Sequence, residues 1–88
     1  MISGAATQIF SATFDRRFFA LPANVQERIQ HRLDELGREL RTFPHHRMQG
    51  VNAFRLRIGD YRVIYQFDSD RNLLLLVAVG HRREVYKS

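Results

Sequence analysis

The stretch between Phe54 and Phe67 alternates apolar and polar residues, and it constrains the fold of this chain more than any other. Gly59-Asp60 interrupts the alternation, and a glycine supplies the positive φ that a tight hairpin turn requires. Because side chains alternate across a strand, the stretch predicts two antiparallel strands with one apolar face. That face comprises Phe54, Leu56, Ile58, Tyr61, Val63, Tyr65 and Phe67. A hairpin of this kind must pack its apolar face on a core.

The opposite face of the hairpin carries arginines. Arg55 and Arg57 occupy it before the turn, and Arg62 occupies it after the turn, together with Ile64 and Gln66. A guanidinium group is always charged, and its planar fork matches phosphate oxygens bidentately. The face therefore predicts contact with phosphate, although a single arginine on a strand is more often a solvated surface charge.

The length of 88 residues, with 44% apolar and 26% charged residues, predicts one ordered globular domain over residues 1–88. The longest apolar run, Leu73–Gly80, has strand length, so no membrane span is expected. The chain has no cysteine, and residues 1–6 show no secretory pattern, which fits a cytoplasmic protein. Whether residues 1–6 are ordered stays open.

The net charge of +5 is unevenly distributed. Residues 1–40 hold five arginines and five carboxylates, whereas residues 41–88 hold eight arginines and one lysine against four carboxylates. A basic half on a small domain favours nucleic acid or an acidic protein as partner. The simpler interpretation is solubility, since small domains often carry a moderate net charge.

The first half of the chain predicts one strand and two helices. We expect a strand over 7–14, a short helix capped by Asp15 and reaching residue 20, and a long helix entered at Pro22. Pro44 is expected to end the long helix. Its apolar stripe at helical spacing comprises Val25, Ile29, Leu33, Leu36 and Leu40.

The second half predicts strands around a loop over 45–52 and a polar turn over 68–72. The apolar run 73–79 predicts an inner strand covered on both faces, and 81–86 predicts a short last strand. The fold class is therefore α+β: two N-terminal helices packed on a largely antiparallel, twisted sheet of four to five strands, in the order β-α-α-β-β-β.

Chemistry-bearing residues gather in the hairpin and near the C-terminus: Arg55, Arg57, Arg62, His81, Arg82, Arg83, Tyr86 and Lys87. RNA cleavage without a metal needs a base for the 2′-hydroxyl, cations for the phosphate and an acid for the leaving oxygen. His81 can serve as acid or base, and Arg62 and Arg82 can clamp the phosphate. Tyr86 can act as a base only if neighbouring arginines lower its pKa.

Structural interpretations compete with each of these roles. Histidine at position 81 is compatible with a hydrogen-bonded strand end, and Tyr86 with an edge aromatic. Tyr61 and Tyr65 are assigned to packing. The pair His45-His46 has no carboxylate or cysteine cluster nearby, so no metal site and no cofactor are expected.

Two motifs together resemble one protein family. Gly59-Asp60-Tyr61-Arg62-Val63-Ile64-Tyr65, followed by Val79-Gly80-His81-Arg82-Arg83-Glu84-Val85-Tyr86, resembles the RelE branch of the RelE/ParE toxin superfamily, and the similarity covers roughly residues 8–87. The resemblance implies a toxin of a type II toxin–antitoxin system that enters the ribosomal A site and cuts mRNA without a metal. It also implies a neutralising antitoxin that wraps the toxin and forms a hetero-oligomer with it.

The resemblance also implies roles for individual residues. Arg62 and Arg82 match the arginines expected to stabilise the phosphate in the transition state, and Tyr86 matches the tyrosine expected to orient the substrate nucleotide. Arg55 matches one of two family lysines, whereas the other falls on Ala53. That departure leaves the general base open and shifts weight onto His81. Arg57, Arg83 and Lys87 are expected to bind RNA.

Two other functions stay open at this stage. A ParE-like toxin that inhibits DNA gyrase without cutting RNA would have the same fold, because fold alone does not decide function. A non-toxic relative that acts only as a co-repressor with its antitoxin is the other alternative.

Overall fold

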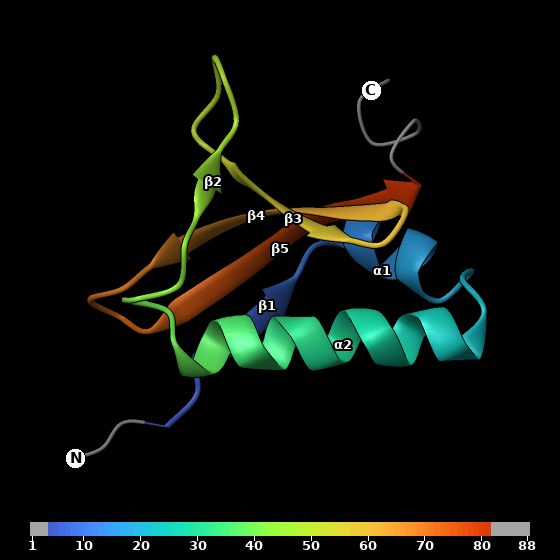
Figure 1. Ribbon diagram of the computed structural model, residues 1–88, viewed down its shortest axis with the longest axis horizontal. Helices are drawn as coiled ribbons and strands as arrows, with labels where there is room; N and C mark the ends of the chain where they lie inside the picture. Colours follow the sequence, from blue (N-terminus) through green and yellow to red (C-terminus); the bar gives the residue numbers. More distant parts are fainter. Residues whose placement is uncertain (1–3, 82–88) are drawn as a thin grey trace.

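The computed structural model describes residues 4–81 and forms two layers, with both helices on one face of a mixed sheet (Figure 1). The elements in chain order are β1 (Thr7–Phe10), α1 (Ala12–Phe18), α2 (Ala23–Arg38), β2 (His46–Arg47), β3 (Phe54–Ile58), β4 (Tyr61–Asp68) and β5 (Leu73–His81). This confirms the predicted α+β class. Within residues 4–81, no helix is both long enough and apolar enough to cross a membrane.

The sheet has five strands in the order β1-β5-β4-β3-β2. Its pairs are antiparallel except β1 with β5, which is parallel. The β3–β4 hairpin turns at Gly59, where φ is +60°, as its sequence predicts. Its predicted apolar face packs on the helices: Leu56, Val63 and Tyr65 are buried there.

Strand β5 lies between β1 and β4, so the prediction of an inner strand is confirmed. The prediction that both of its faces are covered is wrong for the described part of the chain. Leu74, Leu76 and Val79 are buried on the helix side, whereas Val77 is 37% exposed. A bulge interrupts the β4–β5 pairing, because Tyr65 pairs with Leu76 while Ile64 pairs with Ala78, which leaves Val77 as the extra residue.

The start of α1 differs from the prediction. The first strand ends at Phe10, and Ser11, not Asp15, caps the helix by accepting a hydrogen bond at Oγ from the Phe14 amide at 2.9 Å. Ser11 Oγ also donates to the Val77 carbonyl at 2.6 Å, so the cap is tied to the bulge. The Ser11 side chain therefore both caps α1 and holds the start of this helix against β5.

Helix α2 supplies most of the core from the helical layer. Its predicted stripe is buried, with Ile29, Leu33 and Leu36 fully inaccessible. The helix ends at Arg38, well before Pro44, and Leu40 reaches the core from the turn that follows. Ala6 is buried and its amide donates to the Gly37 carbonyl at 2.9 Å, so the chain at Ala6 passes beside the end of the helix.

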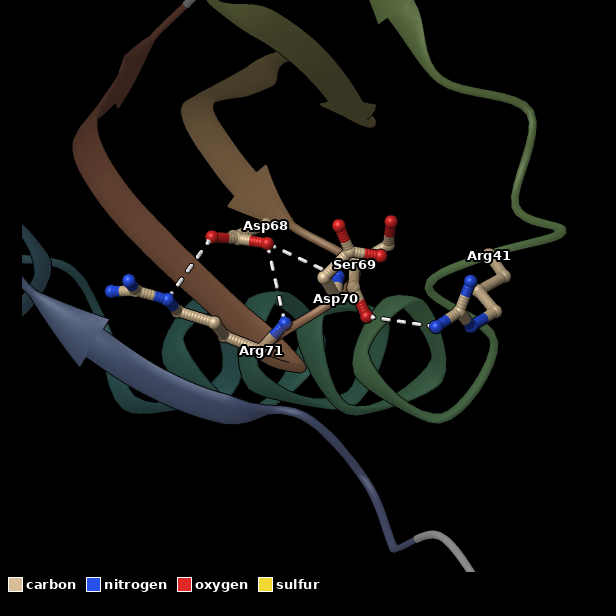
Figure 2. A network of polar contacts seen from close by, with 5 residues as sticks. All are labelled: Arg41, Asp68, Ser69, Asp70 and Arg71. Atoms are coloured by element: carbon tan, nitrogen blue, oxygen red, sulfur yellow. Dashed lines mark hydrogen bonds and ion pairs between the residues drawn. The ribbon is translucent and has the colours of Figure 1, made fainter.

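The polar turn predicted between the last two strands is present and is held by Asp68 (Figure 2). Its Oδ1 accepts from the amides of Asp70 and Arg71 at 3.1 and 3.2 Å, which is an Asx turn. Arg41 donates to the Ser69 carbonyl at 3.3 Å and links this turn to the segment after α2. These contacts hold the end of the sheet where β4 ends and β5 begins, which is opposite the end with the Gly59 turn.

Candidate nucleic-acid interface

Four cationic or titratable side chains line a hollow of about 250 Å³ on the face of the sheet that the helices leave open. They come from three neighbouring strands: His46 from β2, Arg55 and Arg57 from β3, and Arg62 from β4. We call this group the basic hollow. Its lining among the described residues contains no carboxylate. It therefore presents positive charge to any ligand that reaches this face.

The strand register brings these residues together in pairs. His46 lies directly opposite Arg55, and Arg57 lies directly opposite Arg62. Like charges directly opposite each other on antiparallel strands destabilise a sheet. The Arg57–Arg62 pair therefore concentrates positive charge on this face of the sheet.

The arginines of the basic hollow differ in exposure. Arg55 and Arg57 are exposed, whereas Arg62 is half-buried and its Nη1 atom is buried. A half-buried guanidinium has less freedom than an exposed one, so Arg62 is the best positioned of the three to hold a fixed geometry. The resemblance of the hairpin motif to the RelE branch points to the same arginine.

The adjacent histidines, His45 and His46, serve different parts of the molecule. His45 stacks on Phe67 with ring centroids 4.0 Å apart, and its Nδ1 and Nε2 lie 2.6 Å from Tyr65 Oη and 2.8 Å from the Leu40 carbonyl. His46 begins β2 and lines the basic hollow. The prediction of a loop over 45–52 is therefore wrong at its start, since a two-residue strand pairs with β3 there.

The partners of His45 fix its tautomer. A carbonyl can only accept, so Nε2 carries the proton and donates to Leu40, and in the neutral ring Nδ1 accepts from the Tyr65 hydroxyl. Burial raises the pKa of that phenol above its ordinary value of 10, which keeps it a donor. His45 therefore anchors the segment between α2 and β2, and Tyr65 has the packing role predicted from the sequence.

His81 lies away from the basic hollow. It pairs directly with Tyr61 across β4 and β5, and the two rings contact edge to face at 5.9 Å between centroids. Tyr61 packs against the core on the helix side, whereas Arg62, the next residue, lines the hollow on the other side. The structure thus does not bring His81 together with Arg62, because adjacent strand residues point to opposite faces.

Four of the predicted site residues, Arg82, Arg83, Tyr86 and Lys87, lie outside the described residues, as does most of the predicted last strand. For metals, residues 4–81 contain no group of three or more His, Cys, Asp or Glu side chains that could hold an ion. Both ring nitrogens of His45 are engaged in hydrogen bonds, so it does not form a ligand pair with His46.

A larger hollow of about 600 Å³ lies between α2 and the Gly59 turn. Arg28 and Arg32 line it beside Glu27, and Arg57 borders both this hollow and the basic one. Its charges are mixed, so it is a weaker candidate for an anion site.

Comparison with known proteins decides the family. The sequence model described as the ParE toxin of type II toxin–antitoxin systems (parDE) matches residues 9–86. The chain is a toxin of the RelE/ParE superfamily. No curated protein sequence matches this toxin.

Solved structures place this toxin with the RelE branch. A chain of the toxin–antitoxin complex RelBE2 from Mycobacterium tuberculosis is 26% identical, with 92% of this chain and 95% of that chain covered and a TM-score of 0.74. The intact RelBE complex of E. coli matches at 21% identity, with coverage of 88% and 96% and a TM-score of 0.73. The isolated E. coli RelE toxin matches at 19% identity, with coverage of 88% and 84% and a TM-score of 0.74.

Sequence reasoning missed His46 as a member of the site. The available signal was the pair itself: in an extended segment two consecutive histidines point to opposite faces, so one of them had to face away from the core. A predicted loop over 45–52 carries no alternation of faces, so it did not place His46 on either face of the sheet.

Proposed function

We propose that this toxin is an endoribonuclease that enters the ribosomal A site and cuts mRNA without a metal, through attack of the 2′-hydroxyl on the adjacent phosphate. The observation that carries the proposal is the basic hollow, in which three arginines and a histidine converge on one face of the sheet. The matches to RelE structures support it.

In this proposal the arginines divide the work. Arg62, half-buried on β4 near the Gly59 turn, stabilises the charge that develops on the phosphate, together with Arg82. Arg55 and Arg57 hold the neighbouring backbone phosphates, because exposed guanidinium groups bind phosphate without reading its base. Arg83 and Lys87 extend these backbone contacts, and Tyr86 orients the substrate nucleotide.

The test is cleavage of mRNA in stalled ribosomes by the purified toxin, with mapping of the new 5′ ends. Cuts in frame within codons are expected. Arg62→Ala should lower the cleavage rate about a hundred- to thousandfold, the loss typical when one transition-state contact is removed.

Arg71→Ala is the matched control for that variant. It removes the same charge from an exposed side chain, 79% accessible, in the turn between β4 and β5. It should cleave like the parent toxin. Equal rates for the parent and Arg62→Ala would contradict the assignment of Arg62.

A second function, inhibition of DNA gyrase, is favoured by one observation: the matching sequence model is that of the ParE toxins. A supercoiling assay separates the two functions. Inhibition of gyrase with intact mRNA would replace the nuclease proposal by this one, and harmless overexpression with neither effect would favour a co-repressor.

We further propose a cognate antitoxin that covers the open face of the sheet, since the similar chains include members of toxin–antitoxin complexes. Beside the basic hollow, this face bears Ile9 of β1 and Leu73 and Leu75 of β5, which we call the apolar edge. Ile9 is 45% exposed. A segment with apolar and acidic side chains would match both parts of the face.

A further inference from the structure

We propose that His46 is the general base of the cleavage reaction, an inference that rests on the proposed nuclease function. It assigns a residue to the role that the sequence leaves open, because Ala53 stands where the resemblance implies a lysine. Ala53 is also buried, at 9% exposure, and its methyl group carries no titratable atom.

The position of His46 follows from its neighbours on both sides. His45 is held in the aromatic cluster by its stacking on Phe67 and by two hydrogen bonds, so the next side chain must point to the opposite face. Pairing of His46 with Arg55 and of Arg47 with Phe54 fixes β2 against β3. The imidazole of His46 is thereby directed into the hollow that Arg62 lines.

The surroundings of His46 suit a base. The charged groups that line the hollow with it are Arg55 and Arg57 of β3 and Arg62 of β4. Arg47, its neighbour on β2, lies instead over the ring of Phe54, with Cζ 5.1 Å from the ring centroid. A neutral imidazole can accept a proton, and the three guanidinium groups beside it can hold the phosphate next to the 2′-hydroxyl.

Other candidate bases are less well placed. His81 contacts Tyr61 on the helix side of the sheet, away from the arginines. Tyr65 is fully buried and donates to His45. Within residues 4–81, His46 is the one imidazole that lines the basic hollow.

In the proposed reaction every proton and bond is accounted for. His46 takes the proton of the 2′-hydroxyl, and the 2′-oxygen forms a bond to the adjacent phosphorus while the bond from phosphorus to the 5′-oxygen breaks. Water protonates the leaving 5′-oxygen, and His46 returns its proton to solvent. The products are a 2′,3′-cyclic phosphate and a 5′-hydroxyl end.

The test compares His46→Gln with the parent toxin in single-turnover cleavage on stalled ribosomes from about pH 6 to pH 8, where histidine side chains commonly titrate. A base must be deprotonated, so the parent rate should rise with pH. His46→Gln should be at least about a hundredfold slower, with that rise absent. Imidazole added to His46→Ala should restore part of the rate.

Two variants serve as controls. His31→Gln removes an exposed imidazole from α2 and should behave like the parent toxin. Arg62→Ala should be slow but should keep the parent's pH dependence, because it loses a phosphate contact and not the base.

The outcomes separate the two proposals. If the parent toxin cuts no mRNA on ribosomes, the nuclease function and the base assignment both fail. If the parent cuts and His46→Gln cuts at the same rate, only the base assignment fails. A slow His46→Gln that keeps the parent's pH dependence, or a His46→Ala that does not respond to imidazole, also overturns it, because His46 would then act as a phosphate contact.

Discussion

The two sides of the open sheet face differ in chemistry although they belong to one continuous sheet. On β1 and β5 the face carries the apolar edge of Ile9, Leu73 and Leu75, whereas on β2, β3 and β4 it carries the basic hollow. Both helices pack on the other face (Figure 1). The helices therefore cover neither the apolar edge nor the basic hollow.

Each side is also tied to the helical layer by its own polar contacts. Below the apolar edge, Gln8 of β1 donates to Asp34 and accepts from Gln30 of α2, both at 2.9 Å. Below the basic hollow, His45, the residue before β2, links Tyr65 of β4 to the Leu40 carbonyl after α2. The two strands at the ends of the sheet are thus held by side chains rather than by apolar packing alone.

Reversing one charge in the basic hollow should produce the largest difference in cleavage rate between the two sides. Arg57→Glu places a carboxylate opposite Arg62, where we propose that the RNA phosphates bind, so cleavage of mRNA on ribosomes should fall by about a hundredfold or more. Ile9→Asp, an equally acidic change on the apolar edge, should leave the rate within about twofold. A similar loss in both variants would show that the open face works as one surface.

Antitoxin affinity, in contrast, should depend on the apolar edge. Ile9→Asp puts a charge on an exposed apolar side chain, and we expect it to weaken binding of the cognate antitoxin about ten- to a hundredfold. Titration calorimetry measures this, with thermal unfolding as the check that the free toxin stays folded. Unchanged affinity would place the antitoxin elsewhere.

The hydrogen bond between Tyr65 and His45, below the basic hollow, should contribute to the stability of the toxin. Tyr65→Phe removes the hydroxyl that donates to His45 and leaves a partly buried acceptor without that donor, so unfolding free energy should fall by about 1–3 kcal/mol in urea titrations at neutral pH.

The pH dependence of that variant follows from the phenol. Burial raises the pKa of Tyr65 in the folded state, so the unfolded chain ionises first, and stability should be lost as pH rises above about 10. Tyr65→Phe should lose less stability over that range than the parent toxin. An equal loss in both proteins would contradict the effect of burial on Tyr65.

The sequence predicts the basic side better than the apolar one, for a physical reason. Strict alternation around Gly59 determines the faces of β3 and β4, so the alternation alone places Arg55, Arg57 and Arg62 together. The run 73–79 has no alternation, and the bulge at Val77 shifts its register, so its exposed side could not be predicted. Parallel pairing with β1 depends on contacts distant in sequence.

The sequence pattern also could not predict which residue caps α1 or where the two-residue strand β2 lies. Ser11 and Asp15 are both good caps, and the contact of Ser11 with the Val77 carbonyl, distant in sequence, favours the earlier start. The two residues of β2 have no period to detect, so His46 entered the site only through its pairing with Arg55.

The smallest predicted effect distinguishes the two sides by stability. Arg57→Thr relieves the like-charge pair with Arg62 and introduces a residue that strands favour, so unfolding free energy should rise by roughly 0.5 kcal/mol while mRNA cleavage falls. Leu75→Thr on the apolar edge relieves no such repulsion and should not stabilise the toxin. The difference should shrink in high salt, because screening weakens the repulsion between exposed charges. If Arg57→Thr were destabilising at low salt, Arg57 would contribute to the stability of the hairpin, and repulsion between Arg57 and Arg62 would not be a net cost of the basic hollow.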